Sequence, residues 1–381
     1  IWSRCILHLD IDCFYCQCEE IDRNLRDNPT GIRPLAIGQK HIIVTSNYEA
    51  RSYGVKKLQL REKALAACPH LLIVEGSDLL RYKRYSRKVY EAFRLALQEI
   101  ASETSQCGVE MMIPAKKGCM DEMMADLTHV VNHMLDTGDI IIPDDGTNSS
   151  SSTRMDKYYQ SNFVYGDSDA PVTLVEDQTG QTTTVVTSGQ SCSSPDRILS
   201  PCRRNVHDCH VTTTSSMMDQ QLCSQRLHVA GRLVARVCRR IAQETGFFTT
   251  GGISVSPLLA KLASDLNKPK SVNLLYPWRS SMLLYSMPLR KLHGLGRGTM
   301  KALDQSCCFS GSLKQHSEDS SSSKKDDKND KNKTVLDLLQ VPQESIAKAL
   351  QTMHAYQESG SKEQSELLIQ RCRGLDMTEI V

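Results

Sequence analysis

The sequence predicts an α/β protein of two or three domains that is interrupted by two flexible tracts, and one observation supports each part of this description. Apolar runs of strand length alternate with segments in which apolar residues recur at helical spacing. The chain has 381 residues, enough for two or three domains and a sizeable core. Two tracts rich in Ser, Thr and charged residues interrupt the alternation, and such tracts bury too little apolar surface to form core.

The N-terminal elements follow one another in this alternating order. Residues 5–11 are mainly apolar and predict a strand, while residues 15–27 have helical spacing and stop before Asn28 and Pro29. The later elements of this part are a strand at 41–46, a helix at 60–68, a strand at 71–76 and a long helix from 78 to about 100.

The middle of the chain predicts a flexible insertion from about 136 to 220, because its composition shifts to Ser, Thr, Asp and Gly. Residues 221–246 then predict an amphipathic helix. The segment "GGISVSPLLAKLASDL" predicts a turn that feeds a helix, with Ser256 as N-cap and Pro257 at the first helical position. A charged linker is expected at about 311–333, between two helical patches.

Composition excludes several classes of protein. The formal net charge of +2 indicates neither a polyanion partner nor an acidic substrate by itself. Fifteen cysteines, odd in number and scattered, predict reduced thiols in an intracellular protein. The segment "CRRNVHDCH" is a weak candidate zinc site, with Cys202, His207, Cys209 and His210. No apolar run approaches the roughly 18 residues that cross a bilayer, so no membrane association is expected.

Three acidic residues form the candidate chemical centre. Asp10 closes the first predicted strand, and Asp121 and Glu122 are adjacent in "GCMDEMMADLT". If these segments are neighbouring strands, three carboxylates and the Ile11 carbonyl could hold Mg²⁺, which prefers oxygen ligands. Two such ions about 4 Å apart could activate an attacking hydroxyl and stabilise a leaving pyrophosphate. Surface acids at strand ends are the alternative interpretation.

Other side chains suit a nucleoside triphosphate. Thr45, Tyr48 and Arg51 lie on one short segment, where two hydroxyls and a guanidinium could converge on phosphates. Lys261 could add a point charge. Tyr15 could block a sugar 2′-hydroxyl, the group that separates RNA from DNA, although core packing explains an aromatic ring equally well.

Six separated motifs then carry a resemblance to a known family. They are "HLDIDCFYCQCE", "VTSNYEARSYGVKKL", "CPHLLIVEGSDLLRYKRYSRKV", "DEMMADLT", "GISVSPLLAKLAS" and "LRKLHGLGRG". With these motifs in this order along the sequence, the chain resembles the Y-family translesion DNA polymerases, whose motifs follow the same order. The resemblance implies a right-hand architecture: an α+β palm with a mixed sheet (1–12 and 78–277), small α/β fingers (13–77) and a helical thumb (278–381).

The resemblance also implies roles for individual residues. Asp10, Asp121 and Glu122 would be catalytic and bind two Mg²⁺ ions, with Mn²⁺ as an alternative and Ile11 as a main-chain ligand. Gln39 and Ile42 would cover the templating base pair. The residues around the incoming nucleotide, with Tyr15 as the gate that selects the sugar, would be Cys13, Phe14, Tyr15, Thr45, Tyr48, Arg51 and Lys261.

The segment "LRKLHGLGRGTMKAL" would form a helix-hairpin-helix. Its glycines, Gly294 and Gly296, would let backbone N–H groups approach a DNA phosphate. A plain turn between two helices is the alternative.

The function implied by the resemblance is template-directed DNA synthesis of the translesion type. The partners would be primer-template DNA, deoxynucleoside triphosphates and a sliding clamp bound through regions outside this chain, and the location would be the nucleus. Ser256 and Pro257 stand where the family usually has Asn and Lys, which removes one cation. The chain also ends about where the family's little-finger domain would begin, so we expect a piece of a longer polypeptide that binds DNA weakly.

Two other classes of function stay open on the sequence. One is a non-catalytic DNA-binding or scaffolding protein that retains the polymerase fold. The other is a palm-type nucleotide cyclase or a two-metal nuclease, which also use clustered carboxylates but need no thumb hairpin.

Overall fold

A computed structural model describes residues 2–27, 32–104, 111–138, 172–176, 182–186, 217–292, 295–306, 333–352, 358–376 and 378–380. Most of the predicted insertion at 136–220, nearly all of the predicted linker at 311–333, the candidate zinc residues and Gly294 lie outside the described residues.

The centre of the molecule is a five-stranded sheet in the order β10-β9-β1-β6-β5. Neighbouring strands are antiparallel except β9 and β10, which are parallel, so the sheet is mixed. The strands are β1 (Ile6–Ile11), β5 (Ala115–Lys117), β6 (Glu122–Asp126), β9 (Thr249–Ser254) and β10 (Val272–Leu274). This sheet carries the candidate carboxylates.

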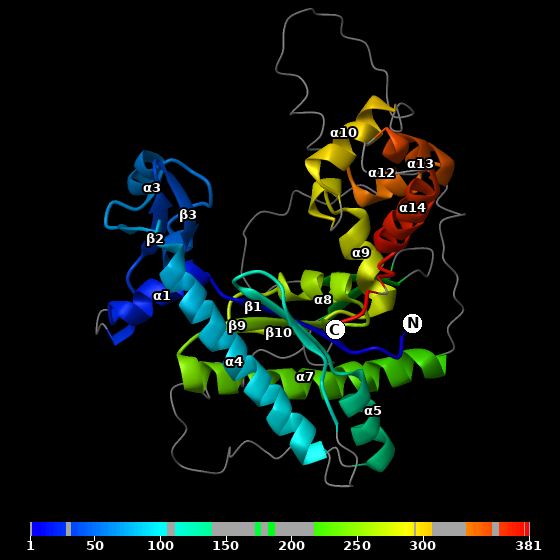
Figure 1. The fold of residues 1–381 in the computed structure, drawn as a ribbon, viewed down its shortest axis with the longest axis horizontal. Coiled ribbons are helices and arrows are strands. Elements are labelled where there is room, and N and C mark those ends of the chain that lie inside the picture. Colours follow the sequence, from blue (N-terminus) through cyan, green and yellow to red (C-terminus); the bar gives the residue numbers. More distant parts are fainter. Residues whose placement is uncertain are drawn as a thin grey trace, which may run out of the picture.

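Helices cover both faces of this sheet (Figure 1). The long helices α4 (Leu79–Thr104) and α7 (Met217–Thr245) lie side by side on one face, and α8 (Pro257–Ser264) packs on the other. Because side chains alternate along a strand, Leu7 and Leu9 point into the core beneath α4 and α7, whereas His8 points toward α8. One strand thus supplies both core and site residues.

The segment predicted as a turn before α8 is instead the strand β9. Gly251 and Gly252 lie inside the strand, where glycine is usually unfavourable. A Cβ atom on Gly252 would lie 2.1 Å from the Ser264 nitrogen and 2.2 Å from the Ala260 oxygen, both backbone atoms of α8. The glycines therefore allow a helix to pack directly on the strand. The predicted cap of α8 is correct, since the Ser256 side chain accepts a hydrogen bond from the Leu259 N–H.

A second, three-stranded sheet has the order β3-β2-β4. It contains β2 (Leu35–Gln39), β3 (Ile42–Ser46) and β4 (Leu72–Glu75), with β2 parallel to β4. Its neighbours are α1 (Phe14–Asp22), the short 3₁₀ helix η1 (Leu25–Asp27), α2 (Tyr48–Ser52) and α3 (Arg61–Ala67). Strand β2 was not predicted.

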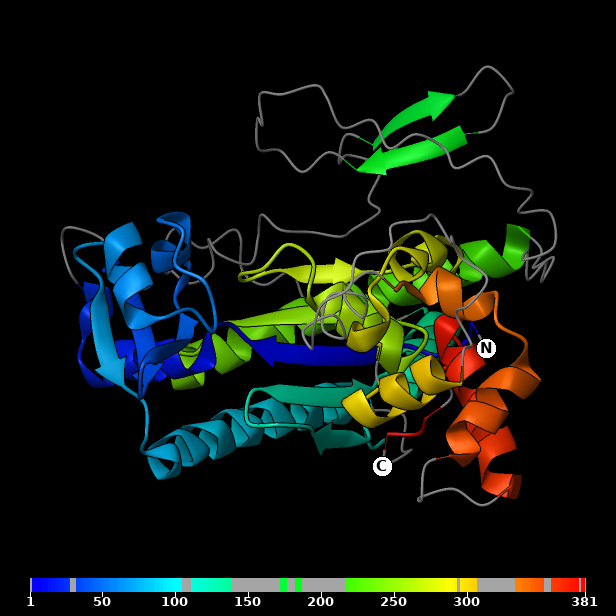
Figure 2. The same ribbon diagram turned by 90° about the horizontal axis from the view of Figure 1, so that it is seen from above.

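The C-terminal helices gather at the opposite end of the molecule from this small sheet (Figure 2). They are η3 (Pro277–Arg279), α9 (Ser280–Tyr285), η4 (Leu289–Lys291), α10 (Arg297–Gln305), α12 (Val335–Leu339), α13 (Gln343–Gln351) and α14 (Glu358–Cys372). The other elements are α5 (Thr128–Thr137) and the antiparallel pair β7 (Val172–Glu176) and β8 (Thr182–Val186).

The architecture confirms the predicted α/β class, with a mixed sheet and helices. The nine cysteines in the described ranges are all free thiols, and Cys119 is the exposed one among them. In the same ranges, no helix combines the length and the apolar character that a bilayer crossing requires.

Candidate active site

Two adjacent strands bring the predicted carboxylates together. In the antiparallel register of β1 and β6, Asp10 stands directly opposite Glu122. The Ile11 N–H donates a 2.8 Å hydrogen bond to the carbonyl of Asp121, so that residue lies at the same end of the sheet. Three acidic residues from segments far apart in the sequence are thus neighbours.

Two lysines neutralise two of these acids, Asp10 and Glu122. The Lys268 Nζ atom lies 2.8 Å from Asp10 Oδ1, and the Lys261 Nζ atom lies 2.7 Å from both carboxylate oxygens of Glu122. Both lysines follow β9 in the sequence: Lys261 lies on α8, and Lys268 lies on the loop after α8. The site is therefore a cluster of alternating charges at the end of the sheet where β1, β6 and α8 meet.

The two carboxyl groups respond differently to these surroundings. Burial raises the pKa of Asp10, while Lys268 acts in the opposite direction and the nearby Asp121 charge adds to the increase. The pKa of Glu122 is lowered to about 2, first by the imidazole of His8, 3.6 Å away, and then by Lys261. The Ser264 hydroxyl contacts the other ring nitrogen of His8 at 2.8 Å, which fixes the orientation of the ring.

The chemistry of this donor set fits a hard divalent cation. Carboxylates on two paired strands, together with the main-chain carbonyl of Ile11, the residue after Asp10, are the oxygen ligands that Mg²⁺ prefers. Within the described ranges, however, no three acidic, His or Cys side chains converge closely enough to form a ligand set as they stand. The ammonium groups of Lys268 and Lys261 form ion pairs with the carboxylates of Asp10 and Glu122, respectively.

An aromatic cluster forms the wall beside the acids. The ring of Tyr15 lies 4.6 Å from that of Tyr82 and 5.4 Å from that of Phe14, centroid to centroid. Burial raises the pKa of Tyr15, and the Asp121 charge adds to the increase, so the phenol lies within electrostatic reach of Asp121. Phe14 is only 3% exposed and packs against Phe247, so its ring supports Tyr15 from the core.

Tyr48 and Arg51 reach the same region from α2. The Arg51 guanidinium lies over the Tyr48 ring, 4.4 Å from its centroid, and its Nε donates to the Ser46 carbonyl. The Asn47 side chain caps the helix by accepting from the Ala50 N–H. Thr45 is the last but one residue of β3, so the three predicted phosphate-binding residues lie on one strand-to-helix corner.

Asp12 is a buried carboxylate that the sequence analysis did not assign. It is 2% exposed and accepts hydrogen bonds from the Thr250 hydroxyl (2.8 Å), the Lys270 backbone N–H (2.8 Å) and the Tyr48 hydroxyl (3.3 Å). Burial raises its pKa to about 6. The carboxylate links β9, α2 and the loop of Lys270, and thereby positions the groups around the site.

The other predicted residues occupy distinct places. Gln39 donates to the Gly76 carbonyl at 2.7 Å, and Ile42, its partner in the β2–β3 register, is 36% exposed on the small sheet. Gly296 is exposed and is the N-cap of α10. Cys13 is the partly exposed N-cap of α1.

Sequence reasoning missed Lys268 as well as Asp12. Asp12 lies two residues after Asp10, and side chains two residues apart in an extended segment point to the same face of a sheet. Lys268 belongs to "NKPK", where two lysines flank a proline directly after α8. These signals are weak without the fold, because only the packing of β9 against β1 brings this loop to the acids.

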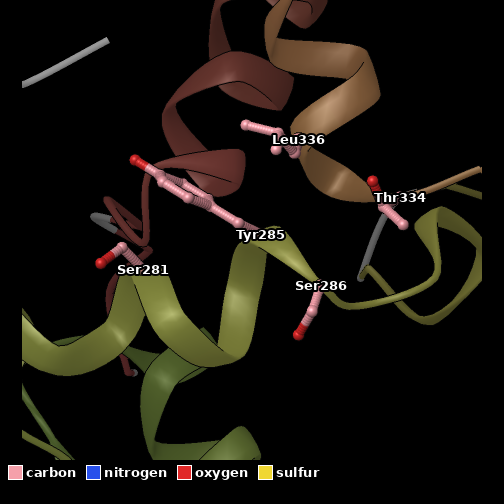
Figure 3. Close-up of a pocket in the computed structure, with 5 residues that line it drawn as sticks. All are labelled: Ser281, Tyr285, Ser286, Thr334 and Leu336. Carbon is pink, nitrogen blue, oxygen red and sulfur yellow. The ribbon is translucent and has the colours of Figure 1, made fainter. Parts of the chain in front are cut away.

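A cavity of about 440 Å³ lies elsewhere, between α9 and the start of α12 (Figure 3). Its lining consists of neutral side chains, those of Ser281, Tyr285, Ser286, Thr334 and Leu336. We therefore assign the chemistry to the charged edge of the sheet and not to this cavity.

Comparison with known proteins identifies the class. The model of the impB/mucB/samB family matches residues 9–265, which include the acids of the charged site and Lys261. The chain therefore belongs to this family, which is the Y-family polymerase domain, and the resemblance inferred from the motifs is confirmed.

The similar proteins are named DNA polymerases. The chain is 28% identical over 304 residues to DNA polymerase iota of Mus musculus, covering 79% of this chain and 31% of that protein. It is 45% identical over 89 residues to DNA polymerase iota of Drosophila melanogaster (23% and 12%). It is 27% identical over 308 residues to DNA polymerase kappa of Mus musculus (79% and 31%). The chain thus spans about a third or less of the length of these relatives.

Proposed function

We propose that this chain is the catalytic part of a template-directed DNA polymerase of the translesion type. In the reaction, the 3′-hydroxyl of a primer attacks the α-phosphate of a deoxynucleoside triphosphate, and pyrophosphate leaves. One observation carries the proposal. Asp10 and Glu122 lie opposite each other on paired strands, and the backbone carbonyl of Asp121 accepts a hydrogen bond from Ile11 at the same end of β1. The family and the names of the relatives support it.

The division into domains follows from the same proposal. The five-stranded sheet with α4, α7 and α8 would be the palm, the three-stranded sheet the fingers, and the helices from η3 onward the thumb. The carboxylates would lie on the palm, beside the fingers. Gly296, at the exposed start of α10, would approach a DNA phosphate, and Gln39 and Ile42 would approach the templating base pair.

The chain's own residues would bind and orient the nucleotide. Arg51 and Tyr48, stacked on each other, offer a guanidinium and a hydroxyl to the phosphates. Lys268 and Lys261 hold the carboxylates with the ammonium groups that would also attract a triphosphate. Tyr15, braced by Phe14 and Tyr82, would exclude a sugar with a 2′-hydroxyl.

Mg²⁺, or Mn²⁺ as an alternative, would be held by Asp10, Asp121, Glu122 and the carbonyl of Ile11, and we propose two ions. When bound, the metal supplies Lewis acidity for the attacking hydroxyl and charge neutralisation for the leaving pyrophosphate. Primer-template DNA and deoxynucleoside triphosphates are then the partners, and we expect a nuclear location and contact with a sliding clamp through other regions.

Single-nucleotide incorporation on a primer-template tests the proposal. The protein and its Asp121→Asn variant are compared with an Asp136→Asn control, since Asp136 is exposed near the end of α5, outside the site. We expect incorporation to be lost in Asp121→Asn and retained in the control. Equal incorporation by both variants would refute the assignment.

A second candidate is a DNA-binding or scaffolding protein without catalysis. It is favoured by the pairing of Asp10 and Glu122 with lysines, which satisfies both carboxylates without a metal. Metal-dependent binding of a deoxynucleoside triphosphate discriminates between the two, because a scaffold has no need of it.

A further inference from the structure

The first turn of α1 contains a pair of cysteines, Cys13 and Cys16, in the sequence "CFYC". Cys13 is the N-cap of the helix and is partly exposed, whereas Cys16 is fully buried. The Cys16 N–H donates to the Cys13 carbonyl at 2.8 Å. A bond between residues three apart closes a turn in which the two Cα atoms are less than about 7 Å apart, which is the range that a disulfide spans.

The side chains of the pair share one apolar cluster with Leu35 and Ile37, and they lie within electrostatic reach of each other. The Cys16 thiol contacts the Leu35 carbonyl at 3.8 Å. Cys13 has a φ of 37° and a ψ of 49°, a left-handed conformation that is uncommon for a residue other than glycine. A C-x-x-C pair at the start of a helix is the arrangement of dithiol redox motifs.

We propose that Cys13 and Cys16 form a reversible disulfide when the protein meets a peroxide. The Cys13 sulfur attacks one oxygen of hydrogen peroxide, the O–O bond breaks, and one water leaves with the thiol proton, so that Cys13 becomes a sulfenic acid. The Cys16 sulfur then attacks the Cys13 sulfur, the S–O bond breaks, and a second water leaves. Two electrons pass from the two sulfurs to the peroxide, and a dithiol such as dithiothreitol reverses the reaction.

The accessibility of the two sulfurs assigns their roles. Cys13 is the one that solvent reaches, so it meets the oxidant, and the buried Cys16 resolves the sulfenic acid. Cys5 and Cys223 also interact with each other, but both are buried and so are shielded from peroxide. Cys119 is exposed and serves as an internal reference for an accessible thiol outside the pair.

The position of the pair couples it to the nucleotide site, a step that rests on the proposed function. Cys13 and Cys16 bracket Phe14 and Tyr15, so a disulfide would lock the turn that carries the proposed sugar gate. Cys13 also lies within electrostatic reach of Tyr48. A bound deoxynucleoside triphosphate should therefore cover Cys13 and slow its oxidation.

The test treats the chain with hydrogen peroxide, alkylates the remaining thiols and analyses the peptides by mass spectrometry. We expect the peptide that contains residues 13–16 to lose two hydrogens, to resist alkylation at both cysteines, and to recover with dithiothreitol. In Cys16→Ala, Cys13 should instead accumulate as a sulfenic acid that dimedone traps, whereas Cys18→Ala should behave like the unchanged chain.

Several outcomes would overturn the inference. They are full alkylation of both cysteines after peroxide, a disulfide that uses Cys18 in place of Cys16, or a yield of trapped sulfenic acid at Cys13 that is the same with and without Cys16. Oxidation is followed again with a deoxynucleoside triphosphate and Mg²⁺, where we expect a slower rate. Disulfide formation at an equal rate would overturn the coupling to a nucleotide site while leaving the redox pair established.

Discussion

Replacing Asp12 by Asn should stabilise the protein at neutral pH, although it alters a buried hydrogen-bonded residue. The folded protein holds the pKa of Asp12 at about 6, against an ordinary value of 3.8, because burial disfavours the charged form. This difference corresponds to about 3 kcal/mol between the protonated and ionised forms. An Asn side chain resembles the protonated acid in charge and shape.

The direction in which the free energy of unfolding changes with pH follows from proton linkage. Because the folded pKa is raised, the favourable contribution of Asp12 is complete below pH 3.8 and is lost as the pH rises through 6. In the Asp12→Asn variant, the amide oxygen of the new side chain would accept from the Lys270 N–H. Its NH₂ group would face the hydroxyls of Thr250 and Tyr48, which can turn to accept.

The assay is urea denaturation of both proteins between pH 4 and pH 8 in the presence of a chelator, with Asp136→Asn as a control for the chemical change. The free energy of unfolding of Asp12→Asn, relative to the unchanged protein, should rise by roughly 2–3 kcal/mol across this range, as Asp12 of the unchanged protein ionises. A difference that is independent of pH, or that falls as the pH rises, would refute the reasoning.

Three further predictions concern packing, pH and sugar selection. Gly252→Ala should lower the free energy of unfolding by about 3 kcal/mol, since its Cβ would meet the backbone of α8, whereas Gly296→Ala, with open space around it, should change it little. Both are measured by urea denaturation. Because the pKa of Glu122 is lowered to about 2, its contribution is present above pH 4.5 and is lost toward pH 2, so the stability of Glu122→Gln should depend less on pH in this acidic range. A parallel pH profile for both proteins would contradict this. Tyr15→Ala should raise ribonucleotide incorporation relative to deoxynucleotide incorporation by about tenfold or more, while Tyr90→Ala, on α4 outside the site, should leave the ratio unchanged. An unchanged ratio in Tyr15→Ala would argue that this ring only packs.

Local chemistry explains which parts of the fold were predictable. The first strand is marked by its apolar run, and α8 is marked by Ser256 and Pro257, which act through contacts within one turn. Asp10 stood out because a charge closes an apolar segment, and Asp121 and Glu122 stood out because two carboxylates are adjacent. Such signals depend on neighbours in sequence, so they survive without knowledge of the tertiary structure.

The parts that were missed depend on contacts between distant segments. Gly251 and Gly252 indicate a turn locally, but the close approach of α8 and α7 requires glycine inside a strand. Strand β2 is short, follows Pro34 directly and contains a β-bulge at Ile37 and Gly38, and it exists because β3 and β4 pair with it on both sides. Lys268 and Asp12 acquire their roles only when β9 pairs with β1.

Mn²⁺ binding, followed by electron paramagnetic resonance in the presence of a non-hydrolysable deoxynucleoside triphosphate, tests the proposed metal site most directly. The proposed mechanism requires Asp10, Asp121 and Glu122 to share a divalent cation. Asp10→Asn should therefore weaken Mn²⁺ binding by about tenfold or more, equivalent to about 1.4 kcal/mol, while Asp136→Asn leaves it unchanged. Equal Mn²⁺ affinity in Asp10→Asn and the unchanged protein would contradict the account.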